Sequence, residues 1–332
     1  MKSVYDKDFR NNGQDLIYKG QNLSLAANLG TVCFVSKNAV PALALPGRID
    51  RPFQTIQAAL DSGAGVNNWP IILFPGIYNE NAIGPVSGSE GYVSLQLMAG
   101  VVINGLIQAR FLRILGAGDS QLFGSIIGRN STFLKDLHSI TCNSNDILRA
   151  ESECLIDGVS HILFNSSTDP IEINPTGGHS AVLRNINSIR NIGTGNLLGN
   201  SKLKLENVGL IETLGAHISN TTETSINAIN CTFQSTNSNF RTRNQLHRYR
   251  NCTLKCSTNA NLTDGWGTKY EFSDTVLIAG PDAAYAVETS SAITPKGYAF
   301  NCRTNKDALF STVSYITDYA ETNTSLGLLS PA

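Results

Sequence analysis

Charged residues are scarce in this 332-residue chain, where Asp, Glu, Lys and Arg together make up 15% and the formal net charge is −1. A nearly neutral chain does not favour nucleic-acid binding, and the low charge excludes a strongly acidic tail. No stretch approaches the roughly 18 apolar residues of a transmembrane helix, so we expect no membrane insertion. Residues 1–20 also lack the apolar core of a secretory signal peptide. We therefore expect no export by a signal peptide.

Cysteine is limited to seven residues, an odd number without paired CxxC modules. This pattern argues against a disulfide framework or a zinc module. Cys231, Cys252 and Cys302 each follow an Asn directly. Because free cysteine is among the most buried residue types, we interpret these three as small core residues. A bridge between stacked cysteines stays open, and we predict no metal site and no cofactor.

The chain does contain an internal repeat. An Asn or Asp recurs about every 22 residues, with an apolar residue two positions earlier, and the successive spacings are 21, 28, 22, 23, 21, 23 and 27 residues. A fixed period of this size is typical of a solenoid. The repeated residues are Asp136, Asp157, Asn185, Asn207, Asn230, Asn251, Asp274 and Asn301.

Each repeat predicts a short strand followed by a bend. In residues 205–210 we expect Leu205, Val208 and Leu210 to point inward, with Glu206 pointing outward. Asn207 lies where the chain has to bend, and Asn tolerates left-handed backbone angles. Coils that stack about 4.8 Å apart also allow the repeated side chains to form an amide ladder. We therefore predict a structural role for the eight repeated residues.

A short helix and two strands are expected ahead of the repeat. Residues 31–35 and 70–74 are apolar strands, and residues 51–60 place Phe53, Ile56 and Leu60 on one helical stripe. Pro52 suits the start of this helix because its missing N–H would be unpaired there.

These segments follow the order PF-x-TIQ-x-AL and then IILFPG-x-Y-x-E, which resembles the N-terminal cap of right-handed parallel β-helix proteins of the pectin-lyase-like superfamily. The matching residues are Pro52, Phe53, Thr55, Ile56, Gln57, Ala59, Leu60, Pro75, Gly76, Tyr78 and Glu80. The resemblance implies an all-β, right-handed, single-stranded parallel β-helix. It also implies that Tyr78 and Glu80 are structural. The fold is shared by pectin-acting enzymes, phage tail spikes and virion proteins, so it does not determine the activity.

We expect about ten coils, because four looser apolar lines precede the clear ones, at residues 92–98, 101–104, 111–115 and 125–127. The predicted organisation is an N-terminal arm that can dock (1–30), an N-terminal cap (31–90), a shaft (91–305), and a C-terminal cap or oligomer contact (306–332).

The catalytic motifs of the pectin-acting enzymes are absent, and we predict no catalytic residue. If the protein is an enzyme, the loose candidates are acidic residues beside the first long insertion, because glycoside hydrolysis needs two carboxyl groups a few ångströms apart. They are Glu151, Glu153, Asp157 and Asp169. The alternative interpretation is an ordinary solvated face.

The Arg-rich stretch is a candidate ligand site, with Arg241, Arg243, Arg248 and Arg250. Arginine binds acidic glycans or phosphate by forked hydrogen bonds. A salt-bridged subunit contact and a merely soluble turn are the alternatives.

The leading functional hypothesis is a non-enzymatic virion protein, a spike, fibre or decoration protein that contacts a host glycan or neighbouring subunits. We expect it in the virus particle as a homo-oligomer, with a trimer favoured, bound to other virion proteins through residues 1–30. A polysaccharide lyase or glycoside hydrolase acting on an acidic glycan is the alternative. A bacterial surface adhesin is disfavoured because no secretion signal is visible.

Overall fold

In this computed structural model the chain forms two compact units, residues 1–129 with 136–138 and residues 130–135 with 139–332. Within the backbone ranges given next, side chains are described from residue 32 onward, except those of 172–173, 202, 240–243, 262–266, 269, 287–289 and 296–298. The backbone is described for residues 9–12, 15–18, 21–22, 32–85, 91–143, 146–167, 171–173, 181–194, 197, 202–214, 225–236, 240–243, 246–257, 262–266, 269–282, 287–289 and 296–305. The predicted C-terminal cap at 306–332 lies outside these residues.

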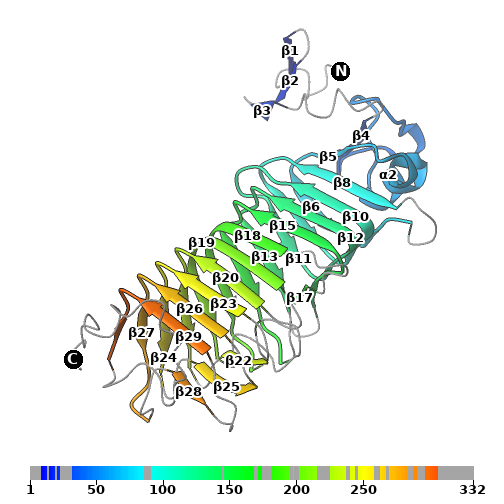
Figure 1. Ribbon diagram of the computed structural model, residues 1–332. Coiled ribbons are helices and arrows are strands. Elements are labelled where there is room, and N and C mark those ends of the chain that lie inside the picture. The colour runs from blue at the N-terminus through cyan, green and yellow to red at the C-terminus, as the bar shows by residue number, and fades with distance from the viewer. Residues whose placement is uncertain are drawn as a thin grey trace. The chain divides into compact units, whose positions relative to one another are not determined.

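The protein is an all-β parallel β-solenoid of about seven turns with about 22 residues per turn, and it has short helices near the N-terminus. Figure 1 shows the parallel strands β19, β20, β23, β26 and β29 side by side along one face. The predicted fold class is confirmed, but the expected count of about ten coils is wrong. The lines at 92–98 and 101–104 are successive strands of one turn, and the line at 125–127 belongs to the same long strand as Leu134.

The first unit begins with three short antiparallel strands, β1 (Phe9–Asn12), β2 (Asp15–Tyr18) and β3 (Gln21–Asn22). Parallel pairing then joins β4 (Cys33–Val35), β5 (Ile71–Leu73), β8 (Tyr92–Leu97) and β10 (Ile107–Leu115) in that order. Parallel pairing also joins β6 (Gly76–Asn79) to β9 (Val101–Asn104), β9 to β11 (Gln121–Phe123), and β7 (Ala82–Ile83) to β10. Consecutive strands of one turn thus lie on different faces.

The predicted helix begins later than Pro52. Thr55 is the N-cap of α2 (Ile56–Ala59), and Phe53 instead forms a parallel bridge with Val35. Helical backbone continues through the π-helix η3 (Leu60–Ala64) and α3 (Gly65–Asn67), across a kink where Gly63 has a φ of 118°. A separate 3₁₀ turn, η2 (Pro41–Leu43), lies in the preceding loop. Among the described residues, no helix is long and apolar enough to span a membrane.

Two long sheets build the second unit. The first sheet runs in the order β12 (Ile126–Lys135), β15 (Glu153–Asp157), β18 (Ala181–Asn191), β19 (Lys202–Thr213), β20 (Ser225–Ile229), β23 (Leu246–Arg250), β26 (Lys269–Ser273) and β29 (Lys296–Phe300). The second sheet runs in the order β13 (Ser139–Cys142), β16 (His161–Phe164), the later halves of β18 and β19, β21 (Thr232–Ser235), β24 (Thr253–Cys256), β27 (Val276–Ile278) and β30 (Arg303–Thr304).

Shorter parallel strands cover further faces of the same unit. One pair is β14 (Leu148–Ala150) with β17 (Ile171–Ile173), and a three-stranded sheet contains β22 (Phe240–Arg243), β25 (Leu262–Trp266) and β28 (Val287–Thr289). Successive turns therefore hydrogen-bond to one another on several sides.

The repeated Asn and Asp residues form the corners of the turns. Seven of the eight have left-handed backbone, with φ between 49° and 55°. The exception is Asp157, where the next residue, Gly158, has the positive φ of 68°. Asp157 pairs in register with Arg184, so Gly158 occupies the position equivalent to Asn185. The predicted alignment was therefore one residue early at this turn, because both Asp and Gly adopt left-handed angles readily.

The same offset changes the neighbouring core positions. Ile156 and Val159 are fully buried, whereas Leu155, the apolar residue two positions before Asp157, is only half-buried. A second correction concerns Leu210, which is also half-buried while Ile211 packs inside. Aromatic rings fill the later turns, as in the stack of Tyr249 on Phe272 at a centroid distance of 5.4 Å.

Candidate functional site

Four consecutive hydrogen bonds link side chains at or beside the corners of successive turns. Each Asn amide nitrogen donates to the side-chain oxygen of the preceding turn, at 2.8 to 3.2 Å. The bonds run from Asn185 to Asp157, from Asn207 to Asn185, from Asn230 to Asn207, and from Asn251 to Asn230. The predicted amide ladder is present, and all of its bonds point in one direction along the solenoid.

The ladder is interrupted and then resumes. Asn301 donates to Asp274 Oδ1 at 2.7 Å. Among the described residues, no side-chain hydrogen bond joins Asp274 to Asn251. An ionised carboxylate has only acceptors, so Asp274 has no proton to donate to the amide oxygen of Asn251.

Asp157 ends the ladder from a position just beside the corner. Its Oδ1 accepts from Asn185 at 2.8 Å, and its Oδ2 accepts from Arg184 Nη2 at 2.9 Å. Burial, the largest influence on this group, raises the pKa of the Asp157 carboxyl, but the Arg184 and Asn185 hydrogen bonds and the Arg184 charge outweigh it. The net pKa is below its usual value. A general acid needs the opposite shift, so Asp157 is held as an ionised acceptor.

The residue after each corner lines the interior. In chain order these positions are Leu137, Val159, Ile186, Val208, Cys231, Cys252, Thr275 and Cys302, and all of them are buried. Beginning at Cys231 they are hydrogen-bond donors, and each lies 2.8 to 3.2 Å from the carbonyl oxygen two residues earlier. The three cysteines are therefore buried core residues, as predicted. Each thiol also contacts the backbone carbonyl oxygen two residues earlier.

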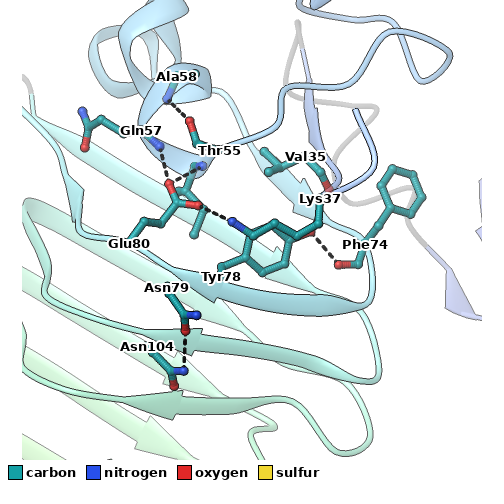
Figure 2. A network of polar contacts seen from close by, with 11 residues as sticks. Val35, Lys37, Thr55, Gln57, Ala58, Phe74, Tyr78, Asn79, Glu80 and Asn104 are labelled. Atoms are coloured by element: carbon teal, nitrogen blue, oxygen red, sulfur yellow. Dashed lines mark hydrogen bonds and ion pairs between the residues drawn. The ribbon is translucent and has the colours of Figure 1, made fainter. Parts of the chain in front are cut away.

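Glu80 and Tyr78 hold the cap of the first unit together, as Figure 2 shows. Glu80 Oε2 accepts from the backbone N–H of Ile56 at 2.8 Å and of Gln57 at 3.3 Å, at the start of α2. Glu80 Oε1 lies 3.3 Å from Lys37 Nζ. A carboxylate is favourable at a helix start, where N–H groups lack helical partners. These residues of the sequence motif therefore have a structural role.

Tyr78, two residues before Glu80, is fully buried. Its hydroxyl lies 2.7 Å from the carbonyl oxygen of Phe74 and 3.1 Å from that of Val35, and Lys37 Nζ lies 4.7 Å from the ring centre. On the next turn, Asn104 donates to Asn79 at 2.6 Å (Figure 2). The tyrosine thus connects the end of β4 with the residue that follows β5.

Two of the acidic candidates, Glu151 and Asp157, have different partners. Glu151 lies 3.4 Å from Arg149 Nε, with both side chains more than a third exposed. Glu153 is exposed at the start of β15, and Asp157 belongs to the ladder. Asp169 lies outside the described residues. Among the candidates that the structure describes, Asp157 is the one that Arg184 and Asn185 hold in place.

The four arginines are divided between two sheets. Arg241 and Arg243 lie on β22, where only the backbone is described, in register with Thr263 and Trp266 of β25. Arg248 and Arg250 lie on the outer face of β23, because the residues that alternate with them, His247 and Tyr249, point inward. Arg248 Nε bonds to Glu271 of the next turn at 2.6 Å.

Sequence reasoning missed a set of ion pairs on the outer faces. Arg190 pairs with Glu212 at 2.6 Å on successive turns, and Arg184 pairs with Asp157. In the sequence these pairs are opposite charges one period apart, at separations of 22 and 27 residues. Only the strand register shows which charged side chains meet. In addition, His161 Nδ1 lies 2.9 Å from Ser188 Oγ on the next turn. Within the described part of the chain, no three His, Cys, Asp or Glu side chains form a group that could hold a metal ion.

Comparison of the chain with protein-family models, with curated proteins and with solved structures gave no match.

Proposed function

We propose that this protein is a non-enzymatic structural component of a virus particle, a spike, fibre or decoration protein whose β-solenoid contacts a host glycan or neighbouring subunits. The observation that carries the proposal is that polar side chains connect the turns of the solenoid. Most polar side chains with a described partner bind to the adjacent turn and thereby hold one turn on the next.

The strongest catalytic candidate supports this interpretation. Asp157 accepts two hydrogen bonds, from Arg184 and Asn185, and its lowered pKa suits an ion-paired acceptor. Arg190 and Arg248 likewise pair with Glu212 and Glu271 of neighbouring turns. Such exposed pairs each contribute about 0.2–1 kcal/mol and mainly favour correct alignment of the turns.

The virus particle enters the proposal through the resemblance of the cap motif to the pectin-lyase-like superfamily, in which virion proteins are common. Under this proposal the chain is a homo-oligomer, with a trimer favoured, and residues 1–30 dock on other virion proteins. An acidic surface glycan is the ligand that we expect at exposed arginines such as Arg250.

An activity assay separates this proposal from a polysaccharide lyase or glycosidase. The purified protein is incubated with a panel of acidic polysaccharides, and both reducing ends and unsaturated products are measured. We expect neither to rise above the level of heat-denatured protein. Product release that is lost in Glu153→Ala would replace the structural proposal with the enzymatic one.

Particle composition tests the location independently. Antibodies against the chain should label intact virus particles from the natural source in immunogold electron microscopy. Particles that lack the chain, by labelling and by mass spectrometry, would contradict a virion role even if no enzymatic activity is found.

A further inference from the structure

The cysteines of the interior stack differ in what lies next to them. Thr232 pairs in register with Thr253 on neighbouring strands, so the preceding residues, Cys231 and Cys252, face each other across two successive turns. Cys302 instead follows Thr275 in the stack. Cys256 pairs in register with Ser235. Within the described corner stack, Cys231 and Cys252 are thus the only cysteines on adjacent turns.

The spacing of these two residues fits a disulfide. Adjacent strands lie about 4.7–4.9 Å apart, inside the roughly 4.4–6.8 Å between the Cα atoms of bridged cysteines. The Cys252 thiol also reaches toward the turn of Cys231, because its Sγ lies 3.5 Å from the carbonyl oxygen of Ala228.

We propose that Cys231 and Cys252 are a disulfide-forming pair that covalently joins two successive turns when the chain meets a small disulfide oxidant such as oxidised glutathione. Both cysteines are free in this structure and only 2% exposed. The oxidant therefore reaches them during folding or when the solenoid opens locally.

The reaction proceeds by two exchange steps. The Cys252 thiolate attacks one sulfur of oxidised glutathione, the glutathione S–S bond breaks, and one glutathione leaves as a thiolate that takes up a proton. Cys231 then loses its proton to solvent and attacks the sulfur of Cys252, which releases the second glutathione. Two protein thiols are oxidised and one glutathione disulfide is reduced to two thiols.

The environment of the pair favours Cys252 as the first nucleophile. The neighbouring Cys231 thiol lowers the pKa of the Cys252 thiol, whereas the Cys252 thiol, together with burial, raises the pKa of Cys231. The thiolate is the reactive form, so the cysteine with the lower pKa attacks first.

Thiol mapping tests the pair. The reduced, denatured chain is refolded in a reduced and oxidised glutathione buffer, and refolding is checked by circular dichroism. Remaining thiols are alkylated in denaturant, and the peptides are analysed by mass spectrometry. We expect two of the seven cysteines to escape alkylation and a linked Cys231–Cys252 peptide that disappears on reduction. The native protein, held with oxidised glutathione just below its Tm, is mapped in the same way, so the result does not depend on refolding.

Two variants provide the comparison. Cys231→Ser should return Cys252 to full alkylation, whereas Cys256→Ser, a buried cysteine on the same turn as Cys252, should leave the linked peptide unchanged. The proposal is overturned if Cys231 and Cys252 are both alkylated in the folded, oxidised wild type. It is equally overturned if Cys252 is linked to a different cysteine.

Discussion

At the scale of single residues, the corner positions differ in whether their side chain can donate a hydrogen bond. Asn185, Asn207, Asn230 and Asn251 each donate to the preceding turn, and their left-handed backbone suits the same residue type. Asp274 has the same backbone angle but no proton to donate when it is ionised. The ladder is therefore one donor short between residues 251 and 274.

Replacing Asp274 by Asn is expected to complete the ladder. The new amide nitrogen can donate to Asn251 Oδ1, while its oxygen still accepts from Asn301. One added hydrogen bond contributes about 1 kcal/mol, so Asp274→Asn should raise the free energy of unfolding by about that amount. Urea denaturation near neutral pH, with an unchanged m-value, measures the gain.

The matched control is Asn230→Asp, which removes an existing donor at an equivalent corner. This variant should lose a similar amount of stability, because it gives up the bond to Asn207 and places a charge against another acceptor. Equal stability of Asp274→Asn and the wild type would show that the side-chain bonds of the ladder add nothing to the stability that the backbone already provides.

At the scale of elements, the start of α2 depends on a carboxylate from a different segment. Glu80 follows β6 in the chain and is separated from Ile56 by 24 residues. Its carboxylate accepts two N–H groups of the helix and pairs with Lys37. Because the Glu80 side chain is only 13% exposed, water replaces these contacts poorly.

Glu80→Ala should therefore destabilise the protein by about 1–3 kcal/mol, the cost of leaving enclosed donors without their charged acceptor. Glu80→Gln keeps one acceptor oxygen and should lose less. Both changes are measured as shifts of the urea midpoint.

Glu271→Ala is the control, because it removes an exposed ion pair with Arg248 and should cost under about 1 kcal/mol. If the Glu80 and Glu271 variants lose the same amount, the carboxylate at residue 80 is an ordinary surface charge rather than a cap.

Much of the element structure was predictable because its causes are local. Apolar runs predicted β4 and β5, and the period of Asn and Asp predicted the corners at Asn185, Asn207 and Asn230. Asp157 was misplaced by one residue, since Asp-Gly offers two residues that tolerate the same backbone angle. Leu210 was misplaced because the inward residue of its turn, Ile211, lies four residues after the corner Asn207. Its register partner on the next turn, Phe233, lies only three residues after the corner Asn230.

At the scale of the whole molecule, the proposed trimer can be tested directly. Size-exclusion chromatography with light scattering should give the mass of three chains for the full protein. We expect the chain without residues 1–30 to remain a trimer, because the proposed subunit contacts lie along the solenoid and the arm is proposed to bind other virion proteins.

A pull-down with disrupted virus particles examines the arm itself. The full chain should retain a virion protein that the chain without residues 1–30 does not retain. A stable monomer whose binding is unchanged by the deletion would contradict both the trimer and the docking arm.

The sequence by itself determined the class of fold and most of the corners, because left-handed Asn, buried apolar residues and a period near 22 act through neighbouring residues along the chain. Only the tertiary structure decided which polar groups meet. Arg184 with Asp157, Glu80 with the start of α2, and Cys231 beside Cys252 are pairs 21 to 27 residues apart. Their contacts depend on the stacking register of whole turns, and a shift of a single residue in that register would exchange inward and outward positions.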